Sequence, residues 1–209
     1  AMASSWTGMV LMPWLQIGRQ QATFVESKNA FYPSAPEGLA NQGAEVYRAN
    51  GCAACHTMQI RGSHTDLQRW GPRVTVAQDY LYADPAMIGS LRIGPDLTNI
   101  GLRKPDASFH LLHLYNPMAT MAPGEKSVMP PYLYLFAKRK VGEKPSPDAL
   151  KLPDVFAVEK GFEVVPTDEA RALAELRKSY LTGLMGLFSS ELENVLITDR
   201  KCSGFLYCF

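Results

Sequence analysis

The stretch NGCAACHTMQIRG, residues 50–62, places two thiols and an imidazole side by side: Cys52, Cys55 and His56. These residue types at this spacing fit three kinds of chemistry. Two cysteines three positions apart form a redox dithiol, supply half of a zinc site, or bond to a haem whose iron is bound by the histidine that follows. The rest of the sequence has to distinguish among the three.

A zinc site and a redox dithiol each lack a feature that they need here. Structural zinc sites use four protein ligands, and the second pair usually follows after a short loop. The next cysteine is Cys202, and His64 has no partner at finger spacing. A thioredoxin-type dithiol lies at the N-terminus of a helix, where the helix dipole lowers the thiol pKa. This CxxC instead follows a segment that ends a helix, so both alternatives are disfavoured.

Haem attachment uses all three residues, because the thiols add to the two porphyrin vinyl groups and the histidine binds the iron. An electron-transfer haem then needs a second axial ligand, normally Met or His, from a distant segment. Met118, Met121 and Met129 follow in a Pro-rich region. We predict Met129 as this distal ligand, because SVMPPY holds it in a rigid turn, with Met121 and the histidines as alternatives.

Three other residues are candidates for orienting the histidine and binding the haem. An axial imidazole usually donates its free N–H to a carbonyl, and Pro95 in RIGPDLTNIG locks a turn that offers one. Arg61 and Arg92 are candidate partners of the haem propionates, since a buried carboxylate needs a cation or several donors. A solvated surface position is an equally good interpretation of both arginines.

Two further groups of residues have a functional and a plainer interpretation. His110 and His113 have a spacing that suits metal binding, but the leucines around them favour packing at the haem edge or local hydrogen bonds. The basic triplet of residues 138–140 follows the predicted distal loop. It is either an exposed turn or a charged docking site for an electron-transfer partner.

Helical patterns position these residues at 36–50, 106–116 and 167–178. The first segment begins with proline and ends at Asn-Gly, and the second is capped by Asp or Ser and ends before a proline. The third has two acids in its first turn, and its Arg177 and Lys178 suit the negative end of the helix dipole. The cysteines therefore lie where the chain leaves the first helix.

Long stretches rich in Gly, Pro and polar residues separate the helices, at 57–105, 117–131 and 141–166. At most one short hairpin is expected, within 57–93. So much irregular chain is unusual in a domain whose core organises itself. A large buried cofactor would organise it, and the expected fold class is mainly α.

The composition is that of an ordinary globular protein and limits the possible functions. Of the 209 residues 46% are apolar, and 21 Lys and Arg balance 20 Asp and Glu. Nucleic-acid binding is disfavoured because no basic excess is present to neutralise phosphates. The apolar run from Gly8 to Ile17 has about half the length needed to cross a membrane, and it lacks the basic leader and cleavage site of a signal peptide.

Taken together, EVYRANGCAACHTMQIR, WGPRVTVAQDYLYADPAMIGSLRIGPDLTNIG, HLLHLYNP and SVMPPYLYLF resemble the mono-haem cytochrome c subunit (subunit II, CcoO or FixO) of cbb3-type haem-copper oxidases. The resemblance runs from about Trp6 to Arg171. It implies a cytochrome c-like haem-binding helical domain with long irregular loop insertions and one covalent haem c. By the same resemblance Cys52 and Cys55 hold the haem, with His56 as the proximal ligand.

The resemblance also implies Met129 as the distal ligand and a role in respiration. The chain would be an electron carrier at the periplasmic face of the bacterial inner membrane, and not an enzyme by itself. Its electrons would come from a di-haem or soluble cytochrome c and pass to the catalytic haem-copper subunit. The alternative from a different functional class is a haem c sensor or ligand-binding protein with a labile distal ligand.

Three regions are expected along the chain. Residues 1–35 would follow a missing membrane anchor, 36–178 would form the mono-haem domain, and 179–209 would be an atypical tail. Without the anchor the chain is expected to be soluble. We hypothesise that the tail is non-native, because it does not resemble the family; the alternative is a divergent helix with a disulfide between Cys202 and Cys208.

Overall fold

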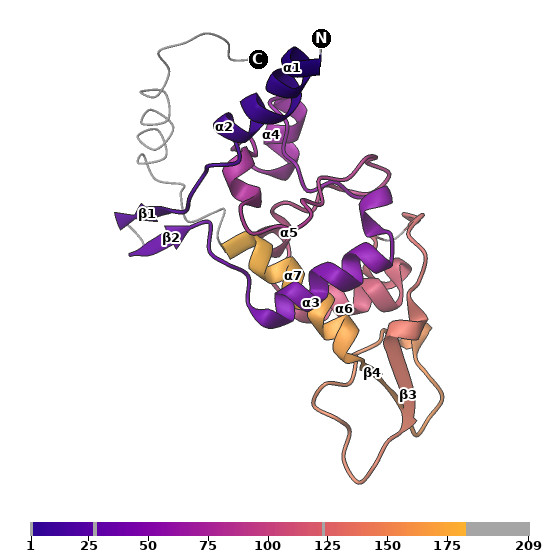
Figure 1. Cartoon of the computed structure of the whole chain (residues 1–209). Helices are drawn as coiled ribbons and strands as arrows, with labels where there is room; N and C mark the ends of the chain where they lie inside the picture. The colour runs from indigo at the N-terminus through magenta and orange to yellow at the C-terminus, as the bar shows by residue number, and fades with distance from the viewer. Residues whose placement is uncertain (1, 27–28, 123, 183–209) are drawn as a thin grey trace.

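Seven α-helices and four short strands form the part of the chain that the computed structural model describes, residues 2–26, 29–122 and 124–182 (Figure 1). The helices are α1 (Met2–Trp6), α2 (Met12–Gln16), α3 (Gly38–Ala49), α4 (His64–Trp70), α5 (Ile100–Arg103), α6 (Ala107–Tyr115) and α7 (Asp168–Thr182). The strands are β1 (Thr23–Val25), β2 (Ala30–Tyr32), β3 (Phe136–Lys140) and β4 (Phe162–Pro166). The predicted mainly α fold class is confirmed.

Helices α3 and α7 cross in close contact at the centre of the molecule, and α5 and α6 also pack against α7 (Figure 1). The close approach depends on Gly43 of α3. A Cβ atom built at this position would lie 2.1 Å from the backbone oxygen of Ala172 and 2.8 Å from Cβ of Leu176. Any larger residue at position 43 would therefore push the two helices apart.

The hydrophobic core is assembled around one of the two CxxCH cysteines. Cys52 is 7% exposed and packs in a cluster with side chains from α3, α6, α7 and the loops between them. The fully or nearly buried members from these elements include Tyr47, Met58, Leu97, Leu114, Leu135, Leu173 and Leu176. Cys52 of the candidate site is therefore part of the hydrophobic core, and the site lies where the loops pack against the helices.

Two predicted helices have nearly the observed bounds, and the third is longer than predicted. Helix α3 lies within 36–50, and α6 begins after Asp106, whose side chain accepts a hydrogen bond from the backbone N–H of Ser108 at 2.9 Å. Helix α7 continues through Thr182. The interpretation of Arg177 as a residue of the last turn is therefore wrong: it lies a turn further inside, and its side chain is buried.

The hairpin expected within 57–93 is absent from that segment, all of which the structure describes. The segment instead contains α4 and a short 3₁₀ helix at Ala77–Tyr80. Hydrogen bonds between its loops hold it together, among them Thr75 N–H to the Ile60 carbonyl at 3.0 Å. The hairpins lie elsewhere, where β1 pairs with β2 and β3 pairs with β4, both antiparallel.

The basic triplet lies on β3, with its side chains exposed or nearly so. Lys138 forms an ion pair with Glu159 at 3.2 Å, and Arg139 forms one with Glu163 at 2.8 Å. Both acids come from the segment that returns through β4. Their charges reduce the positive potential that the sequence alone suggests for this strand.

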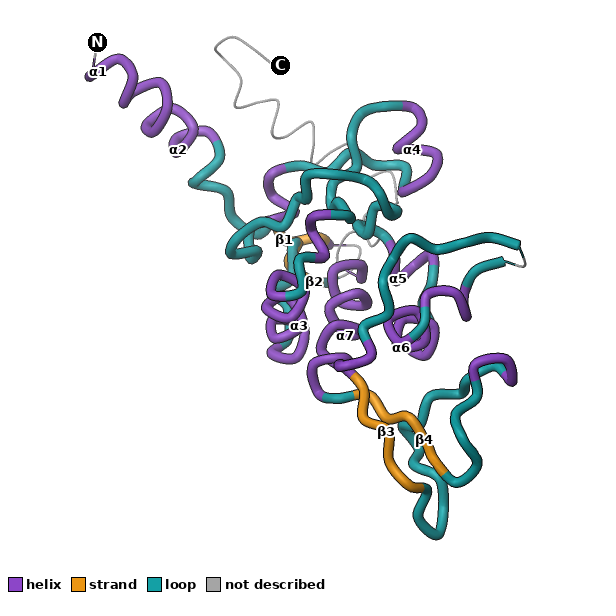
Figure 2. Tube along the Cα trace, turned by 90° about the vertical axis from the view of Figure 1, so that its right-hand side faces the viewer, coloured by secondary structure: helices purple, strands orange, loops and turns teal. Residues whose placement is uncertain are grey.

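The N-terminal stretch of α1, a short π-helix at Thr7–Leu11 and α2 stands away from the body of the molecule (Figure 2). None of its side chains is buried, although it carries Trp6 and Trp14. Among the described helices, none combines the length and the apolar composition that a membrane crossing requires. Cys202 and Cys208 lie outside the described residues, and so do the alternative of a disulfide between them and most of the tail that we hypothesise to be non-native.

Candidate haem-binding site

The CxxCH segment is a tight turn that begins just after α3 ends. Residues Cys52–Ala54 form a 3₁₀ helix, and the Cys52 carbonyl accepts hydrogen bonds from the N–H groups of Cys55 at 3.1 Å and His56 at 3.0 Å. Cys52 is buried and Cys55 is exposed, and neither forms a disulfide. Burial raises the pKa of the Cys52 thiol, opposed by the charge of Arg177. The turn thus presents two free thiols and one imidazole from five consecutive residues.

The His56 ring is held in one orientation by the turn at residues 94–97. Its Nδ1 lies 2.8 Å from the carbonyl oxygen of Pro95. A carbonyl accepts but cannot donate, so Nδ1 carries the proton and Nε2 keeps its lone pair. Burial lowers the pKa of His56, opposed by the bond to Pro95. A neutral, oriented imidazole with a free Nε2 is the form that binds a metal ion.

Gly94 lets this turn lie directly against the imidazole. A Cβ atom at Gly94 would be 2.3 Å from Cε1 of His56 and 2.8 Å from its Nδ1. The Gly94 N–H also donates to the Cys55 carbonyl at 2.9 Å, and the Leu97 N–H donates to the Thr57 carbonyl at 2.8 Å. The turn and the CxxCH segment are therefore joined by backbone bonds on both sides of His56.

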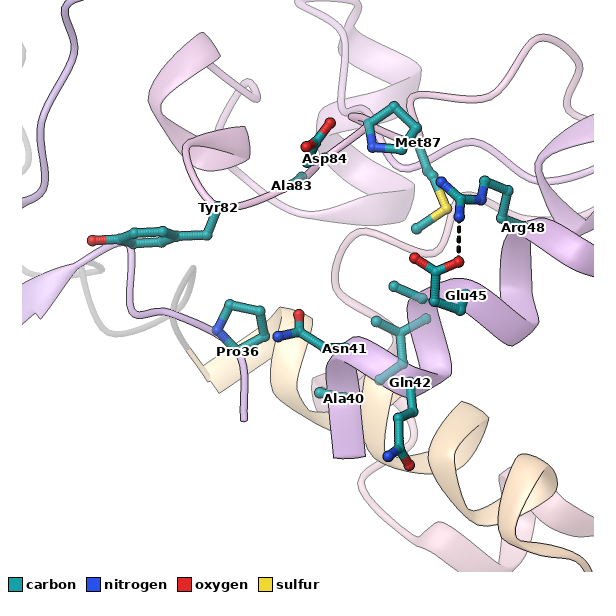
Figure 3. Close-up of a pocket in the computed structure, with 13 residues that line it drawn as sticks. Pro36, Ala40, Asn41, Gln42, Glu45, Arg48, Tyr82, Ala83, Asp84 and Met87 are labelled. Atoms are coloured by element: carbon teal, nitrogen blue, oxygen red, sulfur yellow. Dashed lines mark hydrogen bonds and ion pairs between the residues drawn. The ribbon is translucent and has the colours of Figure 1, made fainter. Parts of the chain in front are cut away.

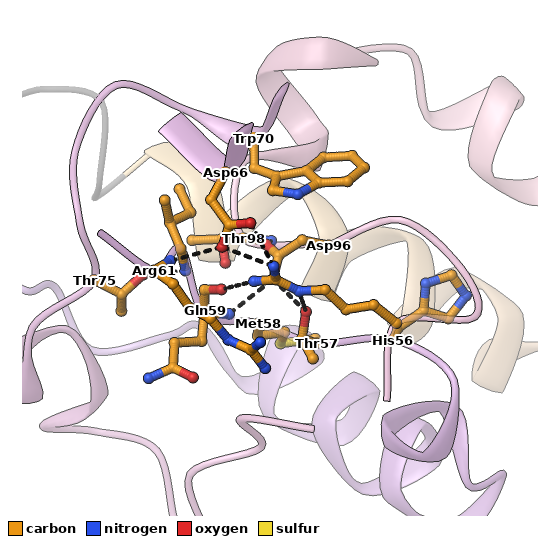
Figure 4. A network of polar contacts seen from close by, with 12 residues as sticks. His56, Thr57, Met58, Gln59, Arg61, Asp66, Trp70, Thr75, Asp96 and Thr98 are labelled. Carbon is orange, nitrogen blue, oxygen red and sulfur yellow. Dashed lines mark hydrogen bonds and ion pairs between the residues drawn. The ribbon is translucent and has the colours of Figure 1, made fainter. Parts of the chain in front are cut away.

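The buried carboxylate of Asp96 holds the same turn in place through hydrogen bonds (Figure 4). Its Oδ2 accepts hydrogen bonds from Thr57 Oγ1 at 2.5 Å and from the Gln59 N–H at 2.9 Å. Its Oδ1 accepts one from the Thr98 N–H at 2.8 Å. Since Asp96 follows Pro95 and Thr57 follows His56, this carboxylate locks both partners of the imidazole bond.

Arg92 completes this network, which extends to Asp66. Its Nη1 lies 2.6 and 2.7 Å from the two Asp66 oxygens, and its Nε donates to Thr57 Oγ1 at 2.8 Å. Its Nη2 also lies 3.5 Å from Oδ2 of Asp96. The guanidinium is thus well supplied with protein partners, and its pairing with a propionate stays a prediction.

Arg61 takes part in the same network through its backbone. Its N–H donates to Oδ2 of Asp66 at 2.9 Å. The side chain of Arg61 is exposed. Its role as a propionate partner likewise stays a prediction.

The distal candidates lie on a loop with fewer fixed contacts. Met129 is half-buried and packs against the cluster that contains Cys52. Its N–H donates to Ser127 Oγ at 3.1 Å. Met118 is 42% exposed, and its sulfur already accepts a hydrogen bond from the Ser127 N–H at 3.3 Å. The contact with the Cys52 cluster favours Met129 over Met118, and the half-buried Met121 remains an alternative.

The two histidines of α6 make the local hydrogen bonds that we expected. Nε2 of His110 lies 2.8 Å from the Lys104 carbonyl, and Nδ1 of His113 lies 2.5 Å from Thr120 Oγ1. Burial lowers the pKa of His113 to about 4, with further lowering by the charges of Arg177 and His56. His113 is therefore neutral at pH 7.

Arg177 is the residue of this site that the sequence analysis missed. It is 6% exposed, and its Nε has no hydrogen-bond partner among the described residues. It follows Ala170 and Leu173 at a helical spacing, so it falls on the apolar face of α7. The signal available in the sequence was a positively charged residue at a position where the helical pattern predicts an apolar one.

A separate pocket of about 430 Å³ lies between α3 and the loop around residues 82–87 (Figure 3). Asn41, Glu45 and Arg48 line it from α3, with Tyr82 and Met87 from the loop. None of the predicted haem-binding residues lines this pocket, but it borders the Cys52 cluster through Met87 and Leu176.

The donor set fits a haem. The thiols of one turn offer two attachment points, and the free Nε2 of His56 offers one axial ligand. Of the three distal candidates, Met129 is the one that packs against the cluster containing Cys52. Among the described residues, no three side chains of His, Cys, Asp and Glu gather in a metal-binding group.

Comparison with known families agrees with this arrangement. A family model described as "Cytochrome C oxidase, mono-heme subunit/FixO" matches residues 5–180, whereas no curated relative matches the chain. The match covers most of the sequence and confirms the resemblance noted from its motifs. A mono-haem subunit of this kind carries one haem c and takes part in electron transport. The chain belongs to the FixO family, the mono-haem subunits of cytochrome c oxidase.

Proposed function

We propose that the chain binds its haem c through thioether bonds from Cys52 and Cys55, with His56 and Met129 as axial ligands. In this role it relays electrons from a partner cytochrome c to the catalytic haem-copper subunit of a cbb3-type oxidase. The observation that carries the proposal is the 2.8 Å contact between His56 Nδ1 and the Pro95 carbonyl, beside two unbridged thiols. This contact supports the proposal that the His56 imidazole is oriented to bind iron.

When bound, the haem supplies a one-electron couple, and the protein supplies orientation, burial and axial tuning. The Pro95 carbonyl makes the imidazole a stronger donor by accepting its N–H. Asp96 and Thr57 keep that contact from rotating away. A methionine opposite the histidine favours a higher potential than a second histidine would, which suits a late step of a respiratory chain.

The proposed partners follow from the family and are consistent with the surface of the chain. Within the oxidase complex, the acceptor would be the catalytic haem-copper subunit, and the donor a di-haem or soluble cytochrome c on the periplasmic side. The exposed N-terminal helices with Trp6 and Trp14 would lie nearest to the membrane surface, where such aromatics are enriched. Arg61 and Arg92 remain the proposed propionate partners.

The proposal is tested by ligand-binding spectroscopy on the purified holoprotein. With His56 and Met129 both bound, reduced protein should take up carbon monoxide slowly or not at all, and oxidised protein should show a methionine-to-iron charge-transfer band. Rapid binding of carbon monoxide by the wild-type protein would contradict the electron-carrier role and favour a sensor with a labile distal ligand. The Met118→Ala variant serves as a control that should behave like the wild type.

A further inference from the structure

Arg177 is a buried cation without a counter-charge in the described part of the chain. Its side chain is 6% exposed and its Nε lacks a hydrogen-bond partner there. No ion pair with a described acid involves it, whereas Arg92 and Arg73 each pair with a carboxylate. A buried charge in this state is costly unless the site makes use of it.

Arg177 lies close to the candidate haem site. Its neighbours on the helix, Leu173 and Leu176, pack in the cluster that contains Cys52. The positive charge of Arg177 lowers the pKa of Cys52 and His56 in the CxxCH turn and that of His113 on α6. Leu173 lies one helical turn before Arg177, so the buried Arg177 is on the side of α7 that packs toward this cluster.

A permanent positive charge near a haem changes the midpoint potential of that haem. Oxidation of a haem adds one positive charge at the iron, and a nearby cation in a medium of low dielectric constant opposes that change. Arginine also stays protonated throughout the accessible pH range.

We propose that Arg177 raises the midpoint potential of the haem by holding an uncompensated cation beside Cys52. The inference rests on the proposed function, since it requires a haem attached at this turn. A unit charge about 10 Å away at an effective dielectric constant of about 20 changes the equilibrium constant for reduction roughly tenfold. For one electron that change corresponds to about 59 mV.

The test is a spectroelectrochemical titration of holoprotein variants. Arg177→Met keeps an unbranched, flexible side chain that can fill part of the same space and removes the charge, so the equilibrium constant for reduction should fall about tenfold. Arg171→Met is the matched control: Arg171 lies on the same helix, is paired with Asp148 at 2.9 Å and with Asp168 at 3.1 Å, and faces solvent. In this control the equilibrium constant for reduction should stay within twofold of the wild-type value, because solvent screens the charge of Arg171.

Arg177→Lys separates the effect of charge from that of packing. Burial lowers the pKa of the introduced amine, so the potential of this variant should be close to wild type at low pH. It should fall toward that of Arg177→Met as the amine loses its proton. The same pH titration of the wild type and of Arg177→Met lacks this step, since neither carries a titrating group at position 177.

The outcomes distinguish this inference from the proposed function. Equal potentials for the wild type and Arg177→Met, with haem bound in both, would overturn the role of Arg177 and leave the proposed function intact. A wild-type chain that takes up no covalent haem would instead overturn the proposed function. If Arg177→Met yields no holoprotein, Arg177→Lys decides: a potential without the pH-dependent step would overturn the inference.

Discussion

The proximal and distal sides of the candidate site are built in different ways. On the proximal side, His56 bonds to the Pro95 carbonyl and lies directly against Gly94, and the buried Asp96 bonds to Thr57, the next residue in the chain. On the distal side, Met129 is half-buried and has one hydrogen bond from its backbone to Ser127. The protein therefore holds the proposed proximal ligand in place through its own contacts, whereas the proposed distal ligand has fewer fixed contacts.

This difference suits an electron carrier whose two ligands have different tasks. A rigid imidazole sets the geometry and electron donation at the iron. Substitutions on the proximal side should therefore act on stability and on ligand geometry, whereas those on the distal side should act on coordination.

Loss of Asp96 should be the most damaging change. Asp96→Leu removes the acceptor for Thr57, Gln59 and Thr98 and leaves Arg92 with one carboxylate fewer. We expect the free energy of unfolding to fall by about 3–5 kcal/mol, measured by urea denaturation of the holoprotein. The control is Asp148→Leu, which removes an exposed partner of Arg171 and should cost less than about 0.5 kcal/mol. Equal losses in both variants would show that the proximal network does not stabilise the fold.

Gly94→Ala should have the next largest effect, because the new methyl group would overlap the His56 ring. We expect a loss of about 2 kcal/mol from overpacking and a changed orientation of the imidazole, seen in the electron paramagnetic resonance spectrum of the oxidised protein. Gly62→Ala is the matched control, since its nearest neighbour would be 3.9 Å away. An unchanged spectrum in Gly94→Ala would mean that the turn does not position the ring.

Met129→Ala should change coordination with a smaller cost in stability. A half-buried side chain contributes about 1 kcal/mol through burial, so the fold should persist. The charge-transfer band should disappear, and carbon monoxide should bind to the reduced protein rapidly. Retention of the band in Met129→Ala, together with its loss in Met121→Ala, would assign the distal ligand to Met121.

The smallest predicted effect is a pH dependence from His113. Its pKa in the folded protein is about 4, below the value of about 6.5 expected in the unfolded chain. The unfolded state therefore takes up the proton first as pH falls, and stability declines between about pH 6.5 and pH 4. His113→Asn should show a shallower decline than the wild type over that window in urea titrations. Identical slopes would show that His113 is not held neutral by the fold.

Local signals in the sequence account for much of the fold and part of the site. The caps at Asp106 and the Asn-Gly end of α3 define two helices within one or two residues. The contact between His56 and Pro95 follows from the turn-forming GPDL sequence and from the need of an axial imidazole for an acceptor. The helix ends depend on residues that are close in sequence. The His56–Pro95 contact joins two motifs 39 positions apart, and the chemistry of each motif indicates the pairing.

The remaining features depend on contacts between distant segments. Asp66 and Arg92 are 26 positions apart, and neither has a neighbour that indicates the pairing. The segment 57–93 holds together through such contacts rather than through strands, which explains the hairpin that we predicted wrongly. Arg177 suited the end of a helix in the sequence, but the helix continues to Thr182 and turns this side chain into the core.

The central claim is that Cys52 and Cys55 bind one haem covalently, and intact mass measured with a pyridine haemochrome spectrum tests it most directly. We predict that the denatured wild-type chain keeps its pigment and is heavier than the polypeptide by one haem, with the spectrum of a porphyrin joined by two thioether bonds. The Cys52→Ser, Cys55→Ser double variant should lose that added mass. A colourless wild-type protein, or one whose pigment passes into acidified acetone, would contradict the account.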